Sequence, residues 1–156
     1  MLVCIAHQWW VAASVVFVAA VATDVADGRV ARALGEVSAR GGLFDHSVDA
    51  IFVASSLGVC AWLGAINVLL PPLILAAFLQ YTLDSQAHVG RALRASRLGR
   101  YNGIAYYVLL GFLTIAPAVG VNLSLAVRYA GWVLAAMTAL SMLDRLLARR
   151  TIPDSP

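Results

Sequence analysis

The sequence DVADGRVARALGEVSARGGLFDHSVD runs from Asp24 to Asp49 and places four aspartates inside a chain of 156 residues that is 62% hydrophobic. Asp24 and Asp27 are three positions apart, and Asp45 and Asp49 are four positions apart. On an α-helix, residues at either spacing lie on one face, one turn from each other. Two helices that meet at this stretch would therefore direct four carboxylates toward one point.

Small residues lie beside these acids in the sequence. Gly28 and Ala31 fall on the same predicted helix face as Asp24, and Gly41 lies one turn before Asp45. The wall next to the carboxylates therefore lacks bulky side chains, and a large ligand can approach the backbone there.

Four converging carboxylates repel one another, and each charged side chain at mid-membrane costs about 2.5–3.5 kcal/mol on insertion scales. A bound cation would relieve both costs. Carboxylate oxygens suit hard divalent ions such as Mg²⁺ or Mn²⁺, and four of them can hold two ions about 3.5–4 Å apart, which favours phosphoryl chemistry. The alternative interpretation is two amphipathic helix ends whose acids are solvated at the membrane surface.

The composition indicates a membrane protein with one domain over residues 1–156. The mean hydropathy is +0.84, and several apolar runs approach the roughly 20 residues that cross a bilayer as a helix. Cys4 and Cys60 lie in apolar segments without a CxxC spacing, so the sequence supports neither a disulfide framework nor a zinc site. The net charge of +3 is modest, and we expect membrane lipids rather than nucleic acid as partners.

The sequence predicts an all-α transmembrane bundle of about five spans, over residues 5–34, 41–63, 71–86, 101–116 and 123–143. Pro71 and Pro72 suit the first turn of the third helix, and Pro117 is expected to end the fourth. No arginine precedes Arg29, so the first apolar run lacks the basic segment of a signal peptide and is expected to stay in the membrane.

The arginines predict the orientation of the bundle. If the turn between the first two helices is cytoplasmic, ten of the eleven arginines face the cytoplasm and only Arg128 lies outside. Four tryptophans agree, since they fall near the opposite interface: Trp9, Trp10, Trp62 and Trp132. The absence of lysine is typical of a GC-rich bacterial genome. We therefore predict a multi-pass protein of the bacterial inner membrane whose acidic site faces the cytoplasm.

The acids and their small neighbours resemble the signature of the CDP-alcohol phosphatidyltransferase family at every position that the signature defines. In this chain the pattern reads Asp24-x2-Asp27-Gly28-x2-Ala31-Arg32-x8-Gly41-x3-Asp45-x3-Asp49. The resemblance implies a homodimeric membrane enzyme of phospholipid biosynthesis. Such an enzyme transfers a phosphatidyl group from CDP-diacylglycerol, or a related CDP-linked donor, to an alcohol and releases CMP. It points to the class that includes phosphatidylglycerophosphate and phosphatidylinositol phosphate synthases.

Members of this family usually have six spans, with one helix before the signature. Only 23 residues precede Asp24 here, which is enough for one span. We therefore expect five spans, with the first helix of the family absent or the start of the chain assigned too late.

The resemblance also implies roles within the signature. Asp24, Asp27 and Asp45 would hold the metal pair, two Mg²⁺ or Mn²⁺ ions, against the diphosphate of the donor. Asp49 would take the proton from the acceptor hydroxyl as the catalytic base, and would also contact a metal. The remaining signature residues would leave room for the nucleotide or bind its diphosphate: Gly28, Ala31, Arg32 and Gly41.

A second group of basic residues bears on the acceptor. Arginines recur every three positions, at Arg91, Arg94, Arg97 and Arg100. They would attract a phosphorylated polyol such as glycerol 3-phosphate or an inositol phosphate. Positive-inside topology explains the same arginines equally well. His46, inside the signature, falls on another helix face than the aspartates, so we expect it to be neutral and to have a structural or interfacial role.

Two other classes of protein remain open. The chain could be a catalytically silent membrane scaffold of the same fold, which the missing helix favours and the intact aspartates oppose. It could also be a divalent-cation transporter, because acids inside membranes mark ion paths. A transporter is expected to carry acids at mid-membrane on several helices, whereas here they cluster at one end beside small residues.

Overall fold

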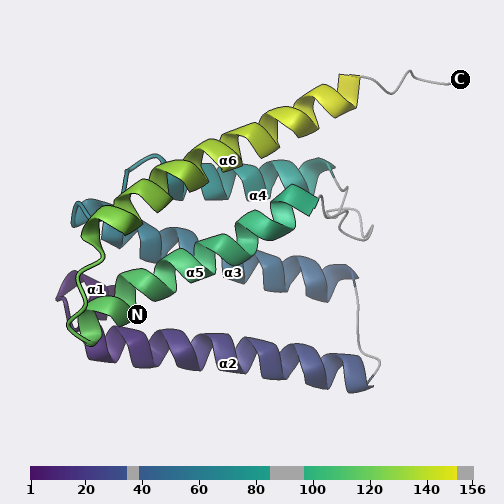
Figure 1. Cartoon of the computed structure of the whole chain (residues 1–156). Coiled ribbons are helices and arrows are strands. Elements are labelled where there is room, and N and C mark those ends of the chain that lie inside the picture. The colour runs from purple at the N-terminus through teal and green to yellow at the C-terminus, as the bar shows by residue number, and fades with distance from the viewer. Residues whose placement is uncertain (35–38, 85–96, 151–156) are drawn as a thin grey trace, which may run out of the picture.

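The computed structural model describes residues 1–34, 39–84 and 97–150 (Figure 1). These residues form six α-helices and no strand: α1 Leu2–Ala6, α2 Trp10–Leu34, α3 Ala39–Trp62, α4 Leu70–Asp84, α5 Arg97–Ala118 and α6 Ser124–Arg150. The predicted all-α class is confirmed.

Four of the helices are long and apolar enough to cross a membrane, over Trp10–Val30, Gly41–Trp62, Gly99–Ala118 and Ser124–Leu147. Many of their large hydrophobic residues face outward, most of all on α2, where only 11% of the residues in the window are buried. Helix α4 is shorter, because its 15 residues extend about 22 Å at 1.5 Å per residue. The prediction of a multi-pass helical bundle is confirmed, with four full-length spans and one short apolar helix in the described part of the chain.

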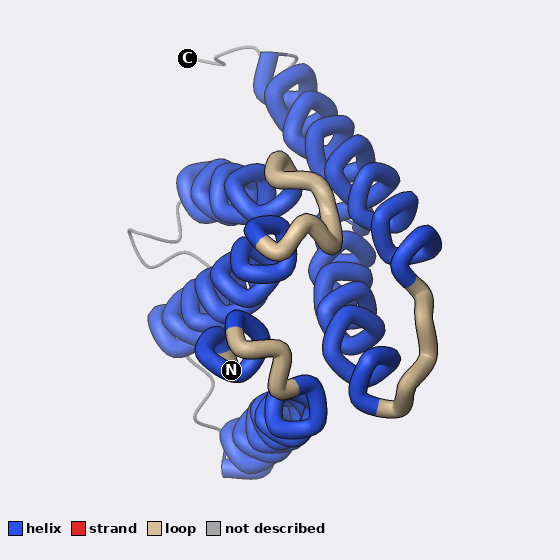
Figure 2. The backbone as a smooth tube through the Cα atoms, turned by 90° about the vertical axis from the view of Figure 1, so that its left-hand side faces the viewer, coloured by secondary structure: helices blue, strands red, loops and turns tan. Residues whose placement is uncertain are grey.

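The helices α2 to α6 pack side by side, and each runs roughly antiparallel to the one before it (Figure 1). Helix α3 packs against α4, α2 packs against α5, and both α4 and α5 pack against α6. Figure 2 looks onto the end of the bundle where residues 7–9, 63–69 and 119–123 connect the helices. The end of α2 and the start of α3 therefore lie at the opposite end, together with the end of α4, the start of α5 and the end of α6.

The start of α4 agrees with the sequence prediction. Pro71 and Pro72 lie in its first turn, where a missing backbone N–H leaves no helical hydrogen bond unmade. The side-chain oxygen of Asn67 accepts a hydrogen bond from the amide of Leu70 at 3.0 Å and caps this end.

The first predicted helix is not continuous. Helix α1 ends at Ala6, and the chain turns through residues 7–9, where Gln8 has a positive φ of 57°, before α2 begins. Burial explains the break, because the side chain of Ile5 is fully buried where α1 packs against α2 and α3. His7 stacks on Trp9 across the turn, with ring centroids 5.2 Å apart. The prediction of one helix over residues 5–34 is therefore wrong at its start.

The fourth predicted helix ends differently as well. Pro117 was expected to end it, but this proline lies inside α5. The helix ends at a Schellman motif, in which the amide of Gly120 donates to the carbonyl of Pro117 at 3.1 Å and the amide of Val121 donates to that of Ala116 at 2.8 Å. Gly120 has a φ of 74°, a left-handed conformation that glycine adopts without strain. The expected stop at Pro117 is therefore wrong, because a glycine three residues later provides it.

Candidate functional site

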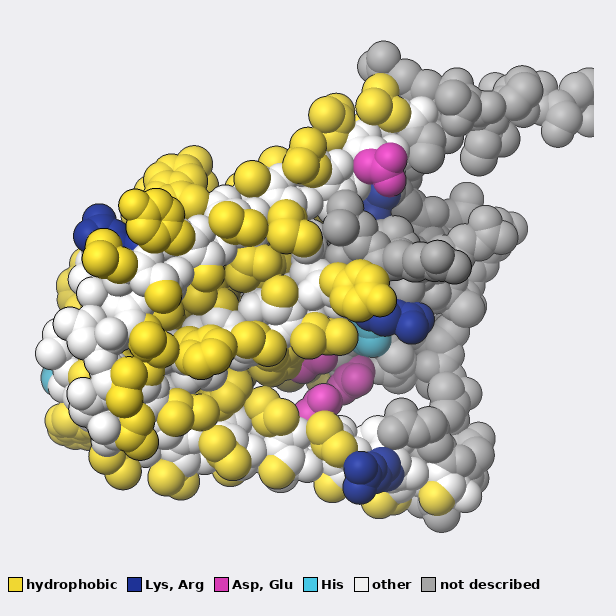
Figure 3. Space-filling view, viewed as in Figure 1, with side chains coloured by type: hydrophobic (Ala, Val, Ile, Leu, Met, Phe, Trp, Pro, Cys, Tyr) yellow, Lys and Arg dark blue, Asp and Glu magenta, His cyan; other side chains and the backbone are white. Residues whose placement is uncertain are grey.

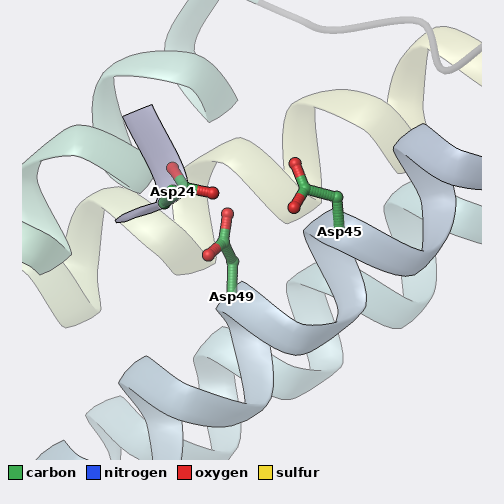
Figure 4. A group of neighbouring side chains, drawn as sticks. All are labelled: Asp24, Asp45 and Asp49. Carbon is green, nitrogen blue, oxygen red and sulfur yellow. The ribbon is translucent and has the colours of Figure 1, made fainter. Parts of the chain in front are cut away.

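Three of the predicted acids converge between the second half of α2 and the first half of α3. Asp24 projects from α2, and Asp45 and Asp49 project from α3 toward it (Figure 4). One carboxylate oxygen of each residue lies within 4.8 Å of one from both of the others. The spacing of four residues on α3 sets its two acids on one face, as the helical period requires.

These three carboxylates form a concentrated negative site. Asp24 and Asp45 are exposed, and Asp49 is partly buried. Like charges at this distance repel, and a divalent cation among them would replace the repulsion by attraction. The donor set consists entirely of oxygen, which suits Mg²⁺ and Mn²⁺. The three residues therefore offer the chemistry of a magnesium or manganese site.

Asp27, the fourth predicted acid, is not part of this group. It lies three residues after Asp24, about one turn closer to the end of α2, and its side chain is exposed. Gly28 follows it and is partly buried. Helix α2 therefore contributes the carboxylate of Asp24 to the cluster, and the carboxylate of Asp27 lies one helical turn away from it.

The remaining signature residues are described only in part. Gly41 lies near the start of α3, one turn before Asp45. The backbones of Ala31 and Arg32 belong to α2, and their side chains lie outside the described part of the protein.

Of the four arginines predicted to bind the acceptor, Arg100 is the one whose side chain is described. It is exposed and lies in the first turn of α5. Arg97 is the first residue of the same helix, and its side chain is outside the described part of the protein. Arg91 and Arg94 lie entirely outside the described residues.

A cavity of about 420 Å³ lies beside the acidic cluster, between α3, α4, α5 and α6. This volume is in the range of small-molecule sites. Much of the wall is apolar, and Asp49 contributes a carboxylate to it. Polar side chains from the other three helices also line the cavity: Gln80, Arg100, Asn102, Thr138, Ser141 and Arg145.

Asp49 belongs to both features, since it is one of the clustered acids and also lines the cavity. The hydroxyl of Tyr107, on α5, donates a hydrogen bond to Oδ1 of Asp49 at 2.5 Å. A short bond to a charged acceptor fixes the carboxylate and leaves Oδ2 for other partners. The sequence analysis missed Tyr107, because two adjacent tyrosines inside an apolar run gave no other signal.

A second hydrogen bond holds the cavity wall between α5 and α6. The hydroxyls of Tyr106 and Thr138 lie 2.5 Å apart, and both residues are buried. Thr138 donates its own proton to the carbonyl of Leu134 at 2.6 Å, so Tyr106 donates to Thr138. His46, for which a structural or interfacial role was expected, is exposed and lines the cavity as well.

Figure 3 shows that charge gathers at this end of the molecule. Acidic side chains lie in a hollow between α2 and the rest of the bundle, basic side chains and a histidine lie beside them, and hydrophobic side chains cover most of the remaining visible face. Two described arginines, Arg100 and Arg145, line the cavity, and the guanidinium of Arg145 lies 4.7 Å from the centre of the Tyr81 ring. The site therefore combines a negative cluster with a positively charged cavity edge.

The family model for CDP-alcohol phosphatidyltransferases matches residues 1–149, which include the acidic cluster and the residues around the cavity. A search of curated proteins found no match to the chain. The acidic cluster and the cavity beside it both lie within the matched residues. Because the match covers nearly the whole chain, the protein belongs to the CDP-alcohol phosphatidyltransferase family.

Proposed function

We propose that this protein transfers a phosphatidyl group from CDP-diacylglycerol to a phosphorylated polyol and releases CMP, as a step of phospholipid biosynthesis. Membership of the family supports the reaction class. The four long apolar helices support a location in the membrane, where the lipid donor resides. The observation that carries the proposal is the position of Asp49, which belongs to the acidic cluster and to the cavity at once.

The acids are proposed to bind two divalent cations, Mg²⁺ or Mn²⁺. Asp24, Asp45 and Asp49 provide an all-oxygen set, and Asp27, one turn away on α2, would complete it. When bound, such ions neutralise the negative charge of a diphosphate and of the leaving CMP. The residues proposed to face the nucleotide and its phosphates are those of the signature that are small or basic: Gly28, Ala31, Arg32 and Gly41.

Asp49 is proposed as the catalytic base. The acceptor hydroxyl attacks the phosphorus that carries the diacylglycerol, a new oxygen–phosphorus bond forms, and the bond from that phosphorus to CMP breaks. The hydroxyl proton passes to Oδ2 of Asp49, since Oδ1 already accepts a hydrogen bond from Tyr107. Tyr107 thereby restricts the carboxylate to one orientation beside the cavity.

The cavity is proposed to bind the acceptor. Arg100 and Arg145 line it and would attract the phosphate of a phosphorylated polyol. Arg91, Arg94 and Arg97, which precede Arg100 in the chain, are proposed to attract the same phosphate. A homodimer in the bacterial inner membrane, with the site open to the cytoplasm, completes the proposal.

The test is CMP release by the purified protein in detergent with CDP-diacylglycerol and Mg²⁺ or Mn²⁺. Glycerol 3-phosphate, inositol 1-phosphate, inositol and serine are compared as acceptors. We expect a phosphorylated polyol to be productive, and excess EDTA to stop the release until the metal is restored. Release only with serine or unphosphorylated inositol would contradict the proposed acceptor class. No release with any acceptor would favour the alternatives, a catalytically silent scaffold or a divalent-cation transporter.

A further inference from the structure

Two buried oxygen atoms in the cavity wall lack a partner. Across residues 1–34, 39–84 and 97–150, the buried side-chain atoms without a hydrogen bond are Ser56 Oγ, Asn67 Nδ2, Gln80 Oε1 and Asn102 Oδ1. Gln80 and Asn102 line the cavity, whereas Ser56 and Asn67 lie elsewhere. Buried polar atoms in native proteins are nearly always paired. Each of these two cavity-lining residues therefore has an unpaired oxygen that a ligand could satisfy.

Both amide side chains are held in place by the surrounding helices. Gln80, on α4, donates from Nε2 to the carbonyl of Met142 on α6 at 2.9 Å, so Oε1 is the end left unpaired. Asn102, on α5, is only 3% exposed and lies one turn before Tyr106, which is bonded to Thr138. Groups that are already ordered lose little conformational entropy when they engage a ligand.

The two arginines that line the cavity, Arg100 and Arg145, are closer to the ends of their helices than Asn102 and Met142 are. Arg100 precedes Asn102 by two residues on α5, and Arg145 follows Met142 by three residues on α6. At 1.5 Å per residue, the backbone of Arg100 lies about 3 Å along α5 from that of Asn102, and the backbone of Arg145 lies about 4.5 Å along α6 from that of Met142. A ligand whose phosphate meets the arginines would place its body beside the two oxygens.

We infer that Gln80 and Asn102 recognise free hydroxyl groups of the acceptor, and that the acceptor carries at least two hydroxyls besides the one that reacts. This inference rests on the proposed function and narrows its substrate to a phosphorylated cyclitol or sugar rather than glycerol 3-phosphate. A carbonyl oxygen accepts and cannot donate, so it selects a hydroxyl or an ammonium group. The neighbouring Arg100 and Arg145 disfavour the ammonium group by charge repulsion.

The experiment is isothermal titration calorimetry of the full chain in detergent with inositol 1-phosphate and with glycerol 3-phosphate. We expect inositol 1-phosphate to bind about tenfold more tightly, because it can pair both oxygens. Asn102→Leu and Gln80→Met should each reduce that preference severalfold. Ser56→Ala is the matched control, since it removes an unpaired buried atom outside the cavity, and it should keep the wild-type preference.

Equal affinity of the wild type for the two ligands, or an unchanged preference in both cavity variants, would overturn the inference. Monodeoxy analogues of inositol 1-phosphate test the same contacts on the wild-type protein, whatever the folding of the variants. At least one of them should bind about tenfold more weakly, and full affinity for every analogue would also overturn the inference. Selective binding without CMP release would refute the proposed reaction and leave the assignment of Gln80 and Asn102 intact.

Discussion

Replacing Tyr107 by phenylalanine tests whether the hydrogen bond to Asp49 controls the rate of the proposed reaction. Phenylalanine keeps the ring and removes only the hydroxyl, so the packing of α5 is preserved while Oδ1 of Asp49 loses its donor. A hydrogen bond to a charged group contributes about 1.5–3 kcal/mol. If that contribution is lost in the transition state, the rate falls by about 10- to 150-fold.

The assay is CMP release at varied CDP-diacylglycerol and acceptor concentrations, which separates kcat from KM. In Tyr107→Phe we expect kcat to fall by the factor given above. The KM for CDP-diacylglycerol should change little, because the lost hydroxyl orients the base and does not neutralise the diphosphate.

Tyr106→Phe is the matched control for this prediction. Tyr106 is the adjacent phenol in the same cavity wall, but its hydroxyl donates to Thr138 and not to Asp49. We expect a wild-type kcat and a lower thermal unfolding midpoint, since a buried hydrogen bond is lost. An unchanged kcat in Tyr107→Phe, or an equal loss in Tyr106→Phe, would refute the reasoning.

Asp49→Asn should lower CMP release by about 10²- to 10⁴-fold, because an amide cannot take the acceptor proton. This variant should still bind Mn²⁺, as measured by electron paramagnetic resonance, because Asp24 and Asp45 remain. Full activity of the variant would exclude Asp49 as the base. Gly120→Ala should lower the unfolding midpoint, since a β-carbon in the left-handed region costs about 1–2 kcal/mol. In Gly58→Ala the new β-carbon meets no atom within 4 Å, so this control should keep or raise the midpoint. Equal midpoints in the two glycine variants would contradict the role assigned to the Schellman motif.

The acidic cluster illustrates what local spacing can predict. Asp45 and Asp49 are four residues apart, and this spacing sets them on one face of α3 whatever the neighbouring helices do. Asp27 marks the limit of the same reasoning. It follows Asp24 by one turn, and the placement of α2 relative to α3 decides which of these two acids reaches the cluster. The helical period of α2 alone does not contain that information.

Features that depend on contacts between distant segments could not be predicted. The break after α1 occurs where Ile5 is buried between α2 and α3, although the apolar run itself continues without interruption. Gln80 and Tyr107 line the cavity from α4 and α5, which come later in the chain than α3. The local sequence around each residue does not indicate which face of its helix will pack toward α3. The end of α5 was misjudged for another reason, since Pro117 was given more weight than the glycine at position 120.

The short length of α4 affects how a membrane would meet the protein. A helix that covers about 22 Å falls short of the roughly 30 Å of hydrocarbon in a typical bilayer. Hydrophobic mismatch of this kind thins the lipid beside the helix or leaves the end of the helix below the headgroups. Because α4 forms one wall of the cavity, a bilayer thinned beside this helix would bring the headgroups and water closer to the cavity. Helix α2, where only 11% of the residues in the membrane window are buried, offers lipid an exposed flank that carries Asp24. On the proposed function, the lipid donor and the polar acceptor would therefore approach the acids from different sides.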